Sequence, residues 1–290
     1  MEKNLTSGSV FKNVVYFSLP FLLSCFLQTL YGMADLFIIG RYEGVEGTAA
    51  VSVGSQVMHM LTVMIVGLAM GTTVAVGRAV GAKNREEVSK NIGNTITLFL
   101  AISAVLTVIL MFFRSGIVSL LSTPEQAAAG AVSYLTVCFA GIPFITAYNI
   151  IASIYRGLGD SKSPMYFIAV ACAANIGLDY LFMGAFHMGA VGAALGTTLS
   201  QLLSVIVSLT KRKSEIPFAV KYLKPDKKTV LALLRVGVPV CLQDGFIQIS
   251  FIIITIIANR RGLTDAAAVG IVEKIIGFMF LVPSSMLSAV

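Results

Sequence analysis

Residues 14–40 read VVYFSLPFLLSCFLQTLYGMADLFIIG, and residues 164–184 read PMYFIAVACAANIGLDYLFMG. Both stretches are apolar and long enough to cross the hydrocarbon core of a bilayer, which takes about 20 residues of α-helix. Each nevertheless carries one acid in its interior, Asp35 in the first and Asp179 in the second. An acid at mid-bilayer costs about 2.5 to 3.5 kcal/mol, so we expect these two acids to bind a proton, an ion or a substrate.

Apolar stretches of this kind follow one another along the whole chain. Of its 290 residues 57% are hydrophobic and only 12% are charged, against about 25% charged in a soluble domain. The runs lack the period-2 alternation of a transmembrane β-barrel. The sequence therefore predicts an all-α integral membrane protein, a polytopic helical bundle. The eight predicted spans are residues 12–40, 48–80, 91–113, 127–155, 164–184, 188–210, 229–258 and 266–290.

The net charge of +7 does not indicate nucleic acid as a partner, because the basic residues do not cluster on one amphipathic face. Most of them lie in the predicted loops on the side of the N-terminus, and Arg41, Arg114, Arg260 and Arg261 lie on the other side. By the positive-inside rule we expect a multi-pass protein of the plasma membrane with a cytoplasmic N-terminus. The N-terminal stretch has no signal-peptide core, so insertion is expected to begin with the first helix.

Cofactor and enzyme motifs are absent from the sequence. The four cysteines fall inside predicted helices without C-x-x-C spacing, so we expect neither a disulfide nor a metal site. The glycines of residues 156–164, RGLGDSKSP, do not complete a phosphate-binding loop, so we expect no use of ATP. No catalytic triad or H-E-x-x-H pair is apparent. We expect no enzyme activity and no cofactor besides H⁺ or Na⁺ as a coupling ion.

The longest polar interruption, residues 211–228, divides the chain. It reads KRKSEIPFAVKYLKPDKK and follows the sixth predicted helix, so residues 1–210 form a six-helix N-lobe and the interruption a basic cytoplasmic linker. Residues 229–290 resemble the opening of the chain, with Pro239 in the place of Pro20, which predicts the first two helices of a second, parallel-repeat lobe. The sequence stops inside an apolar run, so we expect it to be part of a longer protein.

Four polar side chains are predicted to share one depth in the membrane. Asp35 and Asp179 each lie five residues before a glycine near the end of an outward-running span, and Asn175 lies one turn before Asp179 on the same helix face. Thr197 lies nine residues into the next helix, at a similar level. Such a set can form a network that holds a proton. The alternative is a static network that only ties the helices together.

Two features of the first two helices concern their shape and packing. Pro20 removes one backbone hydrogen bond and permits a kink below Asp35, so it is either a gate or an ordinary packing kink. Gly67 and Gly71 are spaced i, i+4, which predicts the close approach of a neighbouring helix. His59 is interpreted as a packing residue.

Other polar residues are candidates for a substrate cavity. Tyr134, Tyr148 and Asn149 lie in the fourth predicted helix, where they either line a cavity or, for the tyrosines, mark the membrane interface. Asp244 lies midway along the seventh helix, where an acid facing a cavity would attract organic cations. The alternative for Asp244 is an internal ion pair, for instance with Lys274.

Several motifs of this chain resemble those of the multidrug and toxic compound extrusion (MATE) family, within a larger group that also holds flippases for polysaccharides and lipid-linked sugars. The resemblance covers the whole chain and is most specific through the first six helices. The motifs that carry it are Pro20 with Tyr31-Gly-Met-Ala-Asp35 and Gly40, Ala49-Ala-Val-Ser-Val-Gly54, Gly77-Arg-Ala-Val-Gly81-Ala-Lys-Asn-Arg-Glu, Arg156-Gly-Leu-Gly-Asp-Ser-Lys-Ser-Pro164 and Asn175-Ile-Gly-Leu-Asp179.

This resemblance implies twelve helices in two six-helix lobes around a central cavity, and drug export driven by a proton or sodium gradient. It also implies roles for individual residues. The cation or proton network would be formed by Asp35, Asn175, Asp179 and Thr197, and Gln28, Tyr134 and Asn149 would lie beside the substrate cavity. A glutamate that another subgroup carries in its seventh helix has no counterpart, because this chain has Ile247 and Gln248 there.

The sequence thus predicts a secondary active antiporter that exports drugs or toxic, often cationic, organic compounds in exchange for H⁺ or Na⁺. Its expected partners are a small-molecule substrate and the lipid bilayer, and the full-length protein is expected to be a monomer. One alternative is a flippase for a lipid-linked saccharide, although the first six helices have no basic residue at mid-depth to bind a pyrophosphate. Another is an inactive truncated fragment of a transporter.

Overall fold

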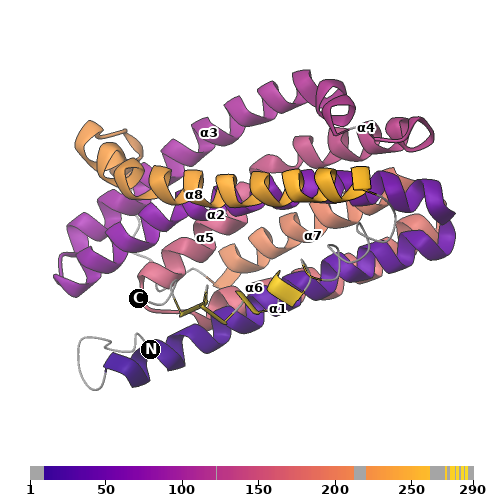
Figure 1. Cartoon of the computed structure of the whole chain (residues 1–290). Helices are drawn as coiled ribbons and strands as arrows, with labels where there is room; N and C mark the ends of the chain where they lie inside the picture. The colour runs from indigo at the N-terminus through magenta and orange to yellow at the C-terminus, as the bar shows by residue number, and fades with distance from the viewer. Residues whose placement is uncertain are drawn as a thin grey trace.

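The computed structural model describes residues 10–121, 123–211 and 220–261 and, farther on, residues 272, 275–277, 279–280, 282–283 and 285–286. The first three of these ranges fold almost entirely into helices (Figure 1). The helices are α1 (Val10–Tyr42), α2 (Gly44–Gly81), α3 (Arg85–Leu120), α4 (Glu125–Ala140), α5 (Ile142–Gly157), α6 (Lys162–Asp179), a π-helix η1 (Tyr180–Ala185), α7 (Gly189–Lys211), a short 3-10 helix η3 (Val220–Leu223) and α8 (Lys227–Arg261).

The fold is that of an all-α integral membrane protein, as the sequence predicts. Among the described residues, six helices are long and apolar enough to cross a membrane, and the bent pair α4 and α5 is a seventh if it counts as one span. Large apolar side chains on the outside suit a lipid environment, such as Val108, Phe112 and Phe113 of α3, which are 69%, 82% and 56% exposed. Six of the predicted spans thus correspond to α1–α7 and the seventh to α8. Most of the predicted eighth span, residues 266–290, lies outside the described residues.

Helix α2 occupies the centre of the bundle. It contacts α1, α3, α4, α5, α7 and α8, and Figure 1 shows α8 running along it. On the other side α6 lies between α1 and α7. Three clusters of buried apolar side chains fill the spaces between these helices. This arrangement places one face of α1 against the pair α6 and α7, where the predicted polar set lies.

The helices turn where the sequence supplies glycines and capping side chains. Gly44, with φ of +69°, turns the chain from α1 into α2, in a left-handed conformation that favours glycine. The Asn84 side chain caps α3 by accepting from the main-chain N–H of Glu87 at 3.1 Å. Gly159, with φ of +86°, turns α5 toward α6, and Asp160 accepts the first N–H groups of α6. The sequence 156–164 is therefore a turn and cap between two helices, with no phosphate-binding loop.

The predicted span 127–155 is bent, which hydropathy did not reveal. It consists of α4 and α5, whose axes differ by 50°. The break lies at Gly141, two residues before Pro143, and a proline at that position suits the first turn of a new helix. A β-carbon on Gly141 would overlap the side chain of Thr198 in α7. The bend therefore lets α7 approach the junction of α4 and α5 closely.

Glycines also allow α2 and α8 to approach each other, as the spacing of Gly67 and Gly71 predicts. A β-carbon on Gly67 would lie 3.0 Å from the Cα atom of Cys241. One on Gly71 would overlap the main chain at Leu233, and one on Gly237 would overlap the main chain of α2. The close approach of these two helices confirms the predicted packing role of Gly67 and Gly71.

The second half of the predicted linker is fastened to α3. Asn94 and Thr97 of α3 bind main-chain groups of the linker. Thr97 Oγ1 donates to the Leu223 carbonyl at 2.6 Å, and Asn94 Oδ1 accepts the N–H of Asp226 at 2.6 Å. The Tyr222 hydroxyl donates to Glu86 Oε1 at 2.7 Å. Gly93 leaves room for the main chain of Tyr222, which lies against it. We call residues 220–226 the clamped segment.

Asp226 joins the clamped segment to α8. Its carboxylate lies 2.9 Å from the Lys90 ammonium and accepts both the N–H and the hydroxyl of Thr229 in the first turn of α8. These donors hold the pKa of Asp226 at about 2, below its ordinary value of 3.8. One side chain thus caps α8 and ties it to α3.

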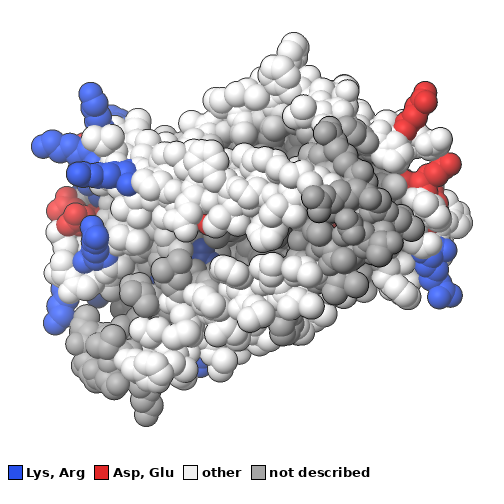
Figure 2. Space-filling model, in the orientation of Figure 1, with Lys and Arg blue, Asp and Glu red and all other residues white. Residues whose placement is uncertain are grey.

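Figure 2 shows where the charges lie on one face of the molecule. Blue side chains, with some red ones among them, gather at the end where α8 begins, and red and blue ones lie at the opposite end, with few between them. Described basic residues at the first end include Arg78, Lys83, Lys224 and Lys228, and those at the opposite end include Arg41. The apolar middle thus separates two charged ends, as expected of a membrane-spanning bundle.

Candidate functional site

Three helices bring the four predicted polar side chains together. Asp35 comes from α1, Asn175 and Asp179 from α6, and Thr197 from α7, and these helices contact one another. All four side chains are buried, and Asp179 has no exposed surface at all. The Thr197 hydroxyl donates to Asp35 Oδ2 at 3.3 Å. The four side chains therefore come together at one level of the bundle, as counting residues along each helix predicts.

Several polar atoms of this set have no hydrogen bond of good geometry. Asp35 interacts with Asn175 and Asp179. Yet Asp35 Oδ1, both carboxylate oxygens of Asp179 and the side-chain amide of Asn175 are buried without a hydrogen-bond partner among the described residues. Such groups cost free energy in a dry interior, because nothing replaces the water that they have lost. A proton or a small cation bound between the oxygens would satisfy the oxygens, so the set is able to bind one.

The helix that carries Asn175 and Asp179 changes its geometry directly after Asp179. Helix α6 ends there and continues as the π-helix η1, Tyr180–Ala185. Single turns of π-helix are rare and frequently occur at functional sites, because the wider turn redirects the side chains beside it. The transition therefore marks the region of Asp179 as an irregular one within an otherwise regular bundle.

Pro20 lies inside α1, on the side of Asp35 that faces the N-terminus. The Ser24 hydroxyl donates to the Pro20 carbonyl at 2.9 Å. Next to the proline, the Phe21 ring lies under the Arg156 guanidinium, 5.1 Å from its centroid, and Arg156 also donates to Ser153 Oγ at 2.9 Å. A cation–π contact thus holds this part of α1 against the end of α5.

The residues predicted for the substrate cavity differ in how far they are buried and come from several helices. Tyr134 is buried, with its hydroxyl 3.1 Å from Ser55 Oγ and its ring against Gly54. Asn149 is buried and donates to a main-chain carbonyl one turn earlier in its own helix, at 2.8 Å. Gln28 is partly exposed on α1. Tyr134 lies close enough to Asp35 to interact electrostatically with it.

Asp244 lies half-buried on α8, at its contact with α2. One carboxylate oxygen would be 2.8 Å from a β-carbon on Gly67, so the acid sits directly over this glycine. In the part of the chain that the structure describes, Asp244 makes no hydrogen bond and no ion pair. Lys274, the alternative partner, lies outside the described residues.

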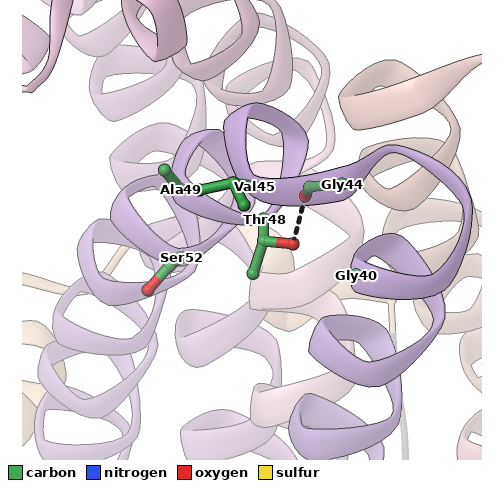
Figure 3. Close-up of a pocket in the computed structure, with 6 residues that line it drawn as sticks. All are labelled: Gly40, Gly44, Val45, Thr48, Ala49 and Ser52. Atoms are coloured by element: carbon green, nitrogen blue, oxygen red, sulfur yellow. Dashed lines mark hydrogen bonds between the residues drawn. The ribbon is translucent and has the colours of Figure 1, made fainter.

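A hollow lies away from all these residues, at the corner between α1 and α2 (Figure 3). It measures about 430 Å³ and is open to the outside. Thr48 turns its hydroxyl toward the Gly44 carbonyl, to which it donates at 2.6 Å. The lining residues are Gly40, Gly44, Val45, Thr48, Ala49 and Ser52. None of the residues predicted for the cavity or the cation site lines this hollow.

Sequence reasoning did not single out two of the contacts described above. Ser55 follows the stretch that ends at Gly54, but a serine beside a glycine is common in membrane helices and does not predict a contact with Tyr134. The contact of Arg156 with Phe21 joins residues far apart in the sequence. No periodicity or spacing could have predicted either pair, because each depends on how helices lie against one another.

Comparison with known proteins gives the family. The family model MatE matches residues 20–181, which include Pro20, Asp35, Asn175 and Asp179. The chain belongs to the MatE family. The resemblance that the sequence motifs indicate is thereby confirmed. Asp35, Asn175 and Asp179 lie within the matched residues, and Thr197 lies beyond them.

Two curated relatives illustrate the likeness in sequence. The probable multidrug resistance protein YoeA of Bacillus subtilis is 32% identical over 281 residues, or 93% of this chain and 61% of YoeA. The multidrug export protein MepA of Staphylococcus aureus is 26% identical over 279 residues, or 94% of this chain and 61% of MepA. The chain therefore spans about three fifths of the length of these MatE relatives.

A crystal structure of MATE in the bent conformation matches with a TM-score of 0.89 at 25% identity, over 97% of this chain and 64% of that one. The structure of MATE in the straight conformation matches with a TM-score of 0.87 at 25% identity, over the same shares of the two chains. The helices described above thus have the arrangement found in solved MATE structures.

Proposed function

We propose that this chain provides the N-terminal lobe and the start of the second lobe of a secondary active exporter, which expels small organic compounds in exchange for H⁺ or Na⁺. The observation that carries the proposal is the buried set of Asp35, Asn175, Asp179 and Thr197, whose oxygens converge without enough hydrogen-bond partners. Membership of the MatE family and the names of its relatives support a role in multidrug export.

Two buried carboxyl groups that face each other favour the binding of a cation. To have both groups ionised with no cation bound between them costs much free energy, because like charges repel strongly where water is excluded. One H⁺ or Na⁺ between Asp35 and Asp179 removes most of this repulsion. Asn175 and Thr197 offer further oxygens to a metal cation. No basic side chain among the described residues pairs with either acid and so competes with the cation.

The division of the site between helices gives the cation a way to control conformation. Asp35 lies on α1, whereas Asn175, Asp179 and Thr197 lie on α6 and α7. The site is complete only when α1 lies against the pair α6 and α7, so a bound cation stabilises that state over one in which α1 has moved. A ligand shifts an equilibrium only by its difference in affinity for the two states. Pro20 offers the place where α1 can bend.

The same proposal assigns the substrate to the space between the lobes. Gln28 and Tyr134 belong to α1 and α4, Asn149 belongs to α5, and Asp244 approaches from α8. The half-buried Asp244 carboxylate has no ion-pair partner among the described residues, which suits a substrate with a cationic group. Exchange of such a substrate for a coupling ion is antiport.

The proposal is tested by replacing Asp35 with Asn in the protein expressed from its full reading frame. We expect gradient-driven efflux of a panel of fluorescent organic cations to be lost in everted vesicles, while the protein remains folded in the membrane. Glu46→Gln is the matched control, because Glu46 is an exposed acid in the first turn of α2. An added uncoupler and replacement of Na⁺ identify the coupling ion. Efflux by Asp35→Asn at the rate of the unaltered protein would refute the proposal.

A further inference from the structure

Helix α7 passes the Asp179 carboxyl group at a glycine. Gly196 directly precedes Thr197, and a β-carbon at this position would overlap Asp179 Oδ1 and lie 3.5 Å from Asn175 Nδ2. Real β-carbons essentially never approach another heavy atom so closely. The Asp179 carboxyl group therefore occupies space that only glycine leaves free at this place on α7.

Neighbouring glycines do not have this relation to the site. Gly192, one turn earlier in α7, faces apolar atoms, because a β-carbon there would lie 3.1 to 3.2 Å from side-chain atoms of Phe182, Met183 and Met188. Gly177, two residues before Asp179 in α6, has nothing within 4 Å of such a β-carbon. The contact between Gly196 and Asp179 is thus particular to the polar set and is not a general property of glycines in α6 and α7.

No hydrogen bond of good geometry fixes the Asp179 carboxyl group, although this group interacts with the Asp35 carboxyl group. Both of its oxygens are buried without a hydrogen-bond partner among the described residues, so no hydrogen bond would hold them in place if α7 were displaced. The chain widens into the π-helix η1 directly after this residue. The distance between the two acids therefore depends on how closely α7 approaches α6, and this approach depends on Gly196.

We propose that Gly196 is a positioning residue of the cation site: its missing side chain sets the place of the Asp179 carboxyl group relative to Asp35, and thereby the affinity for the coupling cation. This inference rests on the proposed function. A residue that orients a cation ligand without touching the cation typically changes affinity by about 10-fold to 100-fold when it is altered. Gly196 bears no polar group, so its effect must come from the position of Asp179 alone.

The test is Gly196→Ala in the protein expressed from its full reading frame. The measurement is the cation concentration, as pH or as Na⁺, that gives half-maximal initial efflux, together with substrate binding in the absence of a gradient. We expect Gly196→Ala to need at least about tenfold more cation, with substrate binding changed less than about twofold. Gly177→Ala is the control and is expected to keep the cation dependence of the unaltered protein, because a β-carbon there has nothing within 4 Å.

A folded Gly196→Ala protein with unaltered cation dependence would overturn the inference. Asp35→Asn, measured in the same vesicles, separates this failure from that of the proposed function: the function fails only if Asp35→Asn retains coupled efflux. If Gly196→Ala does not reach the membrane in folded form, the double variant Gly196→Ala with Asp179→Ala is expected to restore the folded yield, because the overlapping carboxyl group is gone. No restoration would equally overturn the inference.

Discussion

Thr197 is the residue that links the two sides of the buried polar set. Its hydroxyl on α7 donates to Asp35 on α1, and this is the hydrogen bond of good geometry that the structure shows within the set. A hydroxyl group both donates and accepts, so it can donate to an empty carboxylate and can turn its lone pair toward a bound cation. Its contribution is therefore expected to differ between the empty and the occupied site.

Thr197→Val keeps the shape of the side chain and removes the hydroxyl. Hydrogen bonds to charged groups contribute about 1.5 to 3 kcal/mol, so we expect the half-saturating cation concentration for efflux to change by about tenfold or more. Thr197→Ser restores the hydroxyl and is expected to behave like the unaltered protein. Efflux titrations against pH and against Na⁺ measure the effect. Equal cation dependence of the Val and Ser variants would contradict this role.

At this scale the sequence predicts most of the polar set and misses what surrounds it. Asp35 and Asp179 stand out because a carboxyl group in an apolar run is costly, and Thr197 follows from counting residues along a helix. Gly196 escapes notice because glycine is frequent in membrane helices, and its contact with Asp179 exists only in three dimensions. The roles of Asp35, Asn175, Asp179 and Thr197 in coupling stay predictions.

At the scale of elements, composition does not predict where the clamped segment lies. The stretch 211–228 is basic and contains prolines, which predicts a linker, but composition does not say that residues 220–226 are fastened to α3. Likewise, the hydropathy of residues 127–155 predicts one span, and the structure shows that this span bends by 50° at Gly141. A hydropathy profile along the chain contains neither feature.

Asn94→Ala is expected to loosen the clamped segment. The change removes the acceptor for the Asp226 N–H and the donor that lies 3.5 Å from the Tyr222 carbonyl. Local opening exposes main chain to proteases, so we expect faster tryptic cleavage after Lys221, measured by mass spectrometry. Ser89→Ala is the control, because Ser89 lies in the same helix and bonds only to its own preceding turn. Equal cleavage rates for both variants would show that Asn94 does not hold the segment.

The charged ends of the whole molecule predict its orientation in the membrane. By the positive-inside rule we expect the end that carries Lys224 to be cytoplasmic and the end that carries Glu46 to face outward. In a variant without the four native cysteines, we expect an impermeant thiol reagent to label Lys224→Cys in everted vesicles only and Glu46→Cys in intact cells only. Labelling of Lys224→Cys from outside intact cells would show that the protein has the opposite orientation.

At the scale of the whole chain, hydropathy predicts the membrane class and the number of spans through α8, because each span is a local property. The arrangement of α8 along α2 is not local. Spacing of Gly67 and Gly71 predicts that some helix approaches them, but only the structure shows that this helix is α8. The division into residues 1–210, 211–228 and 229–290 stays a prediction.

The clamped segment has a consequence for swapping halves between relatives. Asp226 caps α8 and is bound through its main chain and its carboxylate to Asn94 and Lys90 of α3. In a chimaera joined at residue 211, the residues at 220–226 would come from one relative and α3 from the other. The bonds to Lys90 and Asn94 would then depend on residues of two different parental sequences. A junction placed beyond Thr229, or one that transfers Lys90 and Asn94 together with the incoming half, would keep these bonds within a single parental sequence.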